Sequence, residues 1–131
     1  NKPYIIFPVK LIMTNYKQNK NNSWECLTGE VTHLKWENPD IKIIPINIIM
    51  NKTPYLKEGG LISKFEEVGI NDISIYNILQ EKEFCYDIIN YIVKVNHVNG
   101  INEGYSNMPN IIGYDITTNY RTFNEILKDL I

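Results

Sequence analysis

The chain contains no alanine and only one arginine, whereas it has 18 asparagines and 23 isoleucines. Alanine and arginine have G/C-rich codons, while isoleucine, asparagine, lysine and tyrosine have A/T-rich codons. The skew therefore reports the base composition of the gene, and the abundant residues say little about function. The scarce residues say more, and they are Trp24, Trp36, Cys26, Cys85, His33, His97 and Arg121.

The scarcity of arginine also argues against a duplex nucleic-acid binder, because such proteins use arginine for bidentate contacts with bases and phosphates. The net charge is −2, but it is unevenly distributed. Residues 1–60 contain eight lysines and five acids, a balance of +3, whereas residues 61–131 contain five bases and ten acids, a balance of −5. The acidic second half favours a basic protein partner and no nucleic acid.

Only two cysteines are present, 59 residues apart, so a disulfide framework is excluded and no zinc or redox spacing is matched. Reduced thiols and the absence of a secretory signal pattern predict a cytoplasmic location. The longest apolar run, Ile41 to Met50, is interrupted by Lys42 and Pro45 and falls short of the ~20 residues that span a bilayer. We expect no membrane segment and one globular domain over residues 1–131.

Three strands are predicted in the first half. Tyr4 to Thr14 is rich in β-branched and aromatic residues, and Pro8 requires an edge position or a bulge there. Asn15 to Ser23 is polar and suits an exposed connection. Trp24 to Trp36 forms a second predicted strand, broken at Gly29, and Ile41 to Met50 forms a third, where Pro45 again requires an edge or a bulge.

Helices are predicted in the second half. Leu61 to Val68 has apolar residues at helical spacing, and the apolar stripe from Ile75 to Leu79 predicts another helix with a break at 80–83. Apolar and polar stripes from Phe84 onward predict a helix to about residue 96. The alternative is a hairpin, because Tyr91 to Val98 is β-branched and Asn99-Gly100 is a strong hairpin turn.

The remaining pattern is a loop, a strand and a terminal helix. Residues 99–110 are rich in Gly, Asn and Pro, and Ile111 to Thr117 suits a short strand. Thr122 and Glu125 form a capping box ahead of an amphipathic helix that runs to Ile131. Strands first and helices later predict the α+β class, with an N-terminal, mainly antiparallel sheet of three or four strands and helices from the C-terminal half packed on one face.

No catalytic, metal or cofactor motif is present. Cys85 and His97 are the minimal parts of a cysteine nucleophile, but on one helix they would lie about 18 Å apart, too far for proton transfer. Cys85 is then a small core residue, and His97 at a helix end interacts with the helix dipole. His33 and His97 do not have the i, i+4 spacing of a histidine metal site, and His33 in the predicted strand has no carboxylate placed beside it. The tryptophans fit packing better than base stacking.

The acidic residues of the second half are the candidate partner-binding residues: Glu66, Glu67, Asp72, Glu81, Glu83 and Asp87. Their simplest role is a solvated helix face, but Glu83 and Asp87 repel each other four residues apart, and a basic partner would relieve that repulsion. Small acidic proteins from A/T-biased viral or mobile genes are often inhibitors. We therefore expect a toxin-neutralising immunity protein that binds a basic, nuclease-type toxin through an acidic helical face and has no enzymatic activity. The alternatives are a small enzyme using Cys85 with a histidine, and a structural subunit of a viral or larger assembly.

Overall fold

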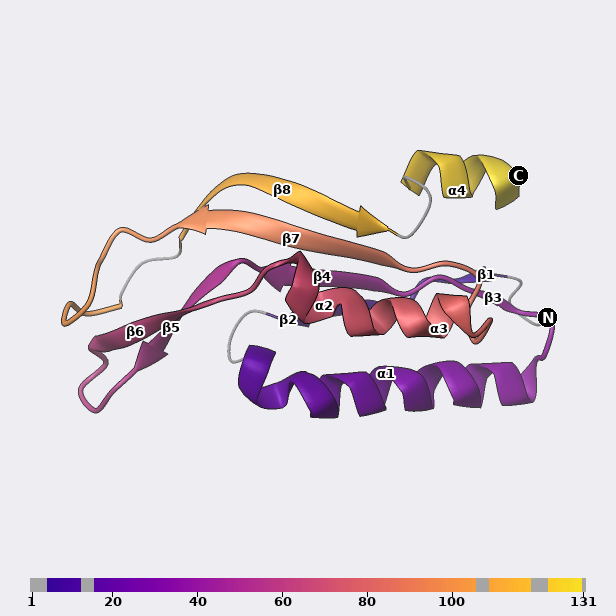
Figure 1. The fold of residues 1–131 in the computed structure, drawn as a ribbon, viewed down its shortest axis with the longest axis horizontal. Coiled ribbons are helices and arrows are strands. Elements are labelled where there is room, and N and C mark those ends of the chain that lie inside the picture. The colour runs from indigo at the N-terminus through magenta and orange to yellow at the C-terminus, as the bar shows by residue number, and fades with distance from the viewer. Residues whose placement is uncertain (1–4, 13–15, 106–108, 119–122, 131) are drawn as a thin grey trace.

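A mixed four-stranded sheet forms the centre of the fold (Figure 1). The computed structural model describes residues 5–12, 16–105, 109–118 and 123–130. The strand order is β2-β4-β7-β8, and the bounds are β2 (Val9–Ile12), β4 (Ile46–Met50), β7 (Ile89–Asn96) and β8 (Asn110–Thr118). Strands β2, β4 and β7 are parallel, and β8 runs antiparallel to β7.

Two small two-stranded sheets flank the central one. Strand β1 (Ile5–Ile6) pairs in parallel with β3 (Lys42–Ile43), and β5 (Lys52–Leu56) pairs antiparallel with β6 (Ile62–Glu67). The strands predicted at 4–14 and 41–50 are therefore present over their described residues, but each is interrupted beside its proline. Proline has no N–H to donate, and the carbonyl of Pro8 still accepts from Ile46 N–H at 2.8 Å.

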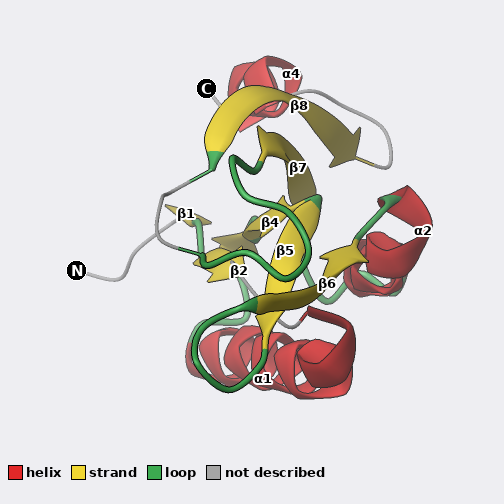
Figure 2. Ribbon diagram, turned by 90° about the vertical axis from the view of Figure 1, so that its left-hand side faces the viewer, coloured by secondary structure: helices red, strands yellow, loops and turns green. Residues whose placement is uncertain are grey.

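Helices connect the parallel strands (Figures 1 and 2). Helix α1 (Tyr16–Glu37) links β2 to β3 and β4. A broken helical segment links β6 to β7, and its parts are α2 (Ile70–Ile73), the 3₁₀ turn η1 (Ser74–Asn77) and α3 (Ile78–Glu81). Helix α4 (Phe123–Leu130) follows β8. Neighbouring parallel strands need such crossover connections. The prediction of a mainly antiparallel sheet is therefore wrong for the central sheet.

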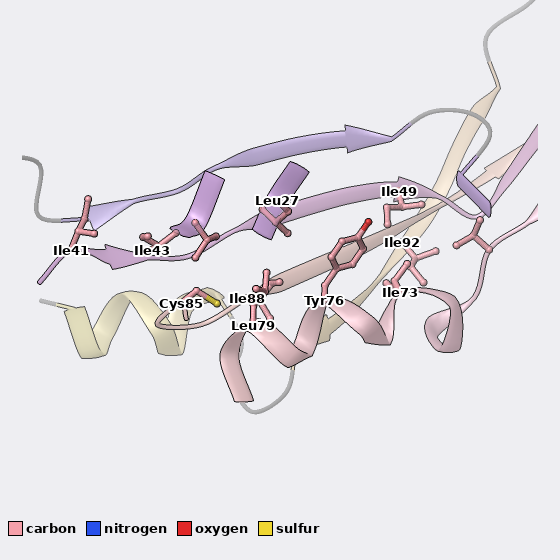
Figure 3. Close-up of a cluster of buried hydrophobic side chains, with 12 residues drawn as sticks. Leu27, Ile41, Ile43, Ile49, Ile73, Tyr76, Leu79, Cys85, Ile88 and Ile92 are labelled. Atoms are coloured by element: carbon pink, nitrogen blue, oxygen red, sulfur yellow. The ribbon is translucent and has the colours of Figure 1, made fainter. Parts of the chain in front are cut away.

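The main core lies between the sheet and the helices α1, α2 and α3 (Figure 3). Leu27 of α1, Tyr76 of η1 and Leu79 of α3 meet Ile49 of β4 and Ile92 of β7 there, all almost fully buried. Burial of each such side chain stabilises the fold by about 1.5–3 kcal/mol.

A second, smaller cluster lies on the opposite face of the sheet. Ile126 of α4 packs there with Ile44 and Ile89, and the ring of Phe123 meets that of Phe7 at 6.1 Å. The sequence predicted that the helices would pack on one face of the sheet. This prediction is wrong, because α4 packs on the other face. Helix α4 has only eight residues and covers one end of this face.

The strand predicted at 24–36 is wrong, because these residues belong to α1. Trp24, Leu27, Val31 and Leu34 follow helical spacing, and all four contribute to the main core. The change of parity at Gly29, interpreted as a strand bulge, is instead helical periodicity. The described part of the predicted connection at 15–23 also lies in this helix.

Two predicted helices are strands. Residues 62–67 form β6, which pairs with β5 through a turn where Gly59 and Gly60 have φ values of +88° and +78°. Residues 89–96 form β7, so the predicted helix to 96 is wrong and its β-strand alternative is right. The connection from β7 to β8 is longer than the tight turn considered at Asn99-Gly100. Strand pairing overrides helical spacing in both segments, through the local hairpin with β5 for β6 and through β4 and β8 for β7.

Other expectations are confirmed. The chain is a mixed α and β protein, the helical stripe at 75–79 is present, and the helix ends at Glu81, within the expected break. The late strand and the terminal helix also form, as β8 and α4. Thr122, the expected cap, lies outside the described residues.

Candidate functional site

The six acidic residues expected at a binding face lie on different elements and differ in exposure. Glu66 on β6 is buried and accepts a hydrogen bond from the Tyr55 hydroxyl at 3.1 Å. Asp87 is also buried, at 1% exposure, and accepts a hydrogen bond from Ile88 N–H at 2.9 Å. Neither carboxylate is available to a macromolecular partner.

The other four acids are more accessible but separated. Asp72, in α2, accepts a hydrogen bond from Gly69 N–H at 2.8 Å. Glu67 is exposed on β6, whereas Glu81 and Glu83 are exposed at the far end of the helical segment. The structure does not bring the six residues together on one helical face.

Glu83 has a structural role at the end of α3 that its sequence position did not indicate. It has a φ of +62° and occupies the position after the helix cap where glycine is usual. Glu83 N–H donates to the Gln80 carbonyl at 3.0 Å, and Phe84 N–H donates to the Leu79 carbonyl at 2.8 Å. These two bonds form a Schellman motif, which ends α3 and turns the chain toward β7.

The Cys85 thiol is not an activated nucleophile. Its side chain is buried in the main core. Burial, which has the largest effect, and the charge of Asp87 together raise the pKa of Cys85 to about 12, against the opposing charge of Lys35. The thiol therefore stays protonated at neutral pH, whereas a catalytic cysteine needs a lowered pKa.

His97 cannot serve Cys85 as a base, because the two residues lie at opposite ends of β7. The eight residues of that strand span roughly 26 Å. His97 Nε2 donates to the Lys52 carbonyl at 2.8 Å, and the ring packs against Phe65 and Tyr105. The histidine joins the end of β7 to the β5–β6 ribbon. The prediction that it lies in the last turn of a helix is wrong.

No metal centre is found in the described part of the chain, since no three His, Cys, Asp or Glu side chains gather there. His33 lies on the exposed side of α1 and pairs with Glu37 at 3.4 Å. Trp24 packs near Tyr76, at 6.3 Å between ring centroids, and Trp36 is exposed. The tryptophans lie on α1 and do not flank a strand.

A cleft of about 570 Å³ lies beside the end of β4, and its lining combines the apolar Val68 and Ile92 with the polar Asn51, Asp72, Lys94 and Asp115. Ligands of open α/β sheets often bind outside the carboxyl ends of parallel strands. Here, however, polar side chains of the cleft already bind other groups of the protein. Lys94 pairs with Asp115 at 3.4 Å, and Asn51 Oδ1 accepts from Val95 N–H at 3.1 Å. The cleft is held together by its own contacts.

The most unusual surface lies on the same side of the central sheet as α4. Helix α4 covers one end of this side, and we call the uncovered remainder the outer face. Its exposed side chains come from the two edge strands, β2 and β8, and their exposed fractions are 63% for Val9, 60% for Leu11, 72% for Ile111, 62% for Tyr114 and 39% for Ile116. Ile48 and Val93 of the central strands lie between them.

Strand register explains why the outer face is continuous. Leu11 pairs with Ile48, Val93 pairs with Tyr114, and paired residues project on the same side of a sheet. The charged residues of these strands, Lys10, Lys94 and Asp115, alternate to the other side. Among the described residues of the four strands, no charged side chain projects from the outer face.

The sequence of β2 alternates, with Val9 and Leu11 on one side of the strand and Lys10 and Ile12 on the other. The outer face could not be predicted from the sequence, because residues 89–96 were predicted to be helical, whereas they form β7. Tyr91 and Val93 of β7 join the two edges of the face, and the rings of Tyr91 and Tyr114 meet edge to face at 5.9 Å.

No protein-family model, curated protein or solved structure matches the chain. Within the described residues, no helix has both the length and the apolar character needed to cross a membrane.

Proposed function

We propose that this chain is a protein-binding module whose contact surface is the outer face. The observation that supports the proposal is an apolar surface that crosses all four strands of the sheet and to which the described strand residues contribute no charge. Five exposed side chains of about 100 Å² each give roughly 500 Å². The largest apolar patch of a monomeric domain is typically about 300–600 Å², and such a patch is often functional.

The proposal keeps the class of function expected from the sequence but moves the contact surface. Recognition of a basic, nuclease-type toxin would need a joined acidic surface, as electrostatic steering requires. Only Glu67, Glu81 and Glu83 of the six acids are exposed, and Glu67 on β6 is separate from the other two at the end of α3. The toxin-neutralising form of the proposal therefore has less support than binding through an apolar surface.

The enzyme alternative has no supporting geometry. Its thiol is buried with a pKa raised to about 12, and the candidate base lies at the other end of β7. A structural subunit of an assembly would also use an apolar contact surface, so that alternative is a special case of the binding proposal.

Site-specific photocrosslinking tests the proposal. A benzophenone amino acid replaces Tyr114 on the outer face, and in a control variant it replaces Trp36, which is 82% exposed on α1. The proposal predicts defined crosslinked protein products from position 114 and none of them from position 36. Equal products from both positions, or products from position 36 alone, would contradict it.

A further inference from the structure

We infer that the occupant of the outer face is a second copy of this chain, packed sheet against sheet around a two-fold axis. This inference rests on the proposed function and names the partner. It follows from the shape, the charge and the area of the outer face.

The outer face has both projecting side chains and hollows, which an interface between two identical surfaces requires. Leu11, Ile111 and Tyr114 project from the edge strands. Between and beside them lie two shallow apolar hollows of about 270 and 180 Å³, with Ile48 and Val93 in their floors. In a two-fold interface each copy presents the same patch to the other. Projecting residues of each copy therefore enter the hollows of its partner. Two twisted sheets pack in this way at about 10 Å, with their side chains interdigitated.

The charge of the outer face also fits a second copy. A two-fold axis places like residues near like residues, so any charge near the axis would face its own copy and repel it. The described residues of the face have no charge to repel. A partner recognised by charge would instead leave matching charges on this surface, and Lys10, Lys94 and Asp115 all project from the other side of the sheet.

The area is sufficient for a weak dimer. Two copies would together bury about 1,000 Å² from the exposed side chains, near the lower limit of specific interfaces. The half-buried Ile48, Tyr91 and Val93 add to this area. Helix α4 covers one end of the face and so limits the contact to the remainder. We therefore expect a dimer that dissociates on dilution in the micromolar range.

Sedimentation velocity over a dilution series from about 1 to about 200 µM brackets this range of affinity. The expected result is a mass that rises with concentration from 15.3 kDa to twice that value and no further. Tyr114→Lys on β8 and Leu11→Lys on β2 would each raise the dissociation constant at least about tenfold, because each places a desolvated charge against its own copy. Trp36→Lys, on the exposed side of α1, would leave the dissociation constant unchanged.

Circular dichroism and urea unfolding establish that each variant is folded. If a lysine variant unfolds, Tyr114→Thr keeps a strand-forming residue and removes the projecting ring, and it should still weaken the dimer. A monomer at every concentration would overturn the inference, as would a dimer that both outer-face variants leave intact or an open series of larger species. A monomer would leave the crosslinking test of the proposed function untouched, so the two failures are distinguishable.

Discussion

The buried pair Asn47 and Asn90 offers a quantitative test of the fold. The two residues face each other in the parallel register of β4 and β7, and both have 0% exposure. Asn47 Nδ2 donates to Asn90 Oδ1 at 2.8 Å. Asn47 Oδ1 is buried with no hydrogen-bond partner among the described residues. The pair therefore sits in the main core with one acceptor unsatisfied.

Replacement of one partner by leucine should destabilise the protein, because the other keeps a buried polar group without its bond. The expected cost is about 1–3 kcal/mol for Asn47→Leu or for Asn90→Leu. The double variant removes the bond and both amides and adds apolar surface. Its free energy of unfolding should lie within about 1 kcal/mol of the parent. The double-mutant cycle should thus give a coupling close to the sum of the two single costs, roughly 2–6 kcal/mol.

Urea unfolding, monitored by tryptophan fluorescence and circular dichroism, gives the four free energies. A control cycle combines Asn47→Leu with Ile126→Val, which lies on the opposite face of the sheet, and should be additive. Additivity of Asn47→Leu and Asn90→Leu would refute the contact, and with it the parallel register of β4 and β7.

Three further predictions concern single residues. In native protein at pH 7.5, Cys26 should react with a thiol reagent and Cys85 should not, because Cys26 is exposed and Cys85 is buried; equal labelling by mass spectrometry would contradict this. Because the pKa of Cys85 is raised to about 12 in the fold, its contribution to stability should be complete below about pH 8.5 and fall as the pH rises toward 12. Urea unfolding of Cys85→Val, which cannot ionise, should show a smaller alkaline loss than the parent. Glu83→Gly should raise the free energy of unfolding by about 0.5–1 kcal/mol, since glycine relieves the φ of +62°, whereas Glu83→Ala keeps the strain and should give no such gain.

Local patterns predicted some elements of the fold well. The apolar spacing before residue 81 predicted the helical segment and its end, and the proline positions predicted the interruptions of the first and third strands. The alternating and amphipathic patterns near the C-terminus predicted β8 and α4. In these segments the local preference and the tertiary environment agree.

Elsewhere the local pattern was ambiguous and long-range packing decided the outcome. Residues 89–96 alternate, with Ile89, Tyr91, Val93 and Val95 on one side and Asn90, Ile92, Lys94 and Asn96 on the other. The apolar residues from Phe84 to Val93 also fit helical spacing, so the local pattern supported both assignments, and pairing with β4 and β8 decided between them. In α1, the asparagines and threonines favoured a non-helical assignment, although Thr28 and Thr32 bind carbonyls four residues earlier within the helix.

The candidate surface could not be predicted from the sequence, since it depends on which strands are neighbours. Val9 and Ile111 are about a hundred positions apart in the chain, and only the order β2-β4-β7-β8 places them on one face. Charged residues show the opposite effect. Glu66 and Asp87 looked like surface carboxylates in the sequence, but Glu66 is buried on β6 and Asp87 is buried in the connection that leads to β7.

Methyl NMR tests most directly whether the outer face is a contact surface. Isoleucine methyl groups are labelled, and the signals of Ile111 and Ile116 on the outer face are compared with that of Ile78 on α3, which has the same 39% exposure as Ile116. The signals are assigned by single Ile→Val variants and followed through a dilution series. Shifts of Ile111 and Ile116 with concentration, with Ile78 constant, are the predicted result. Constant signals at all three residues, or a shift of Ile78 alone, would contradict the self-association of this chain through the outer face of its sheet.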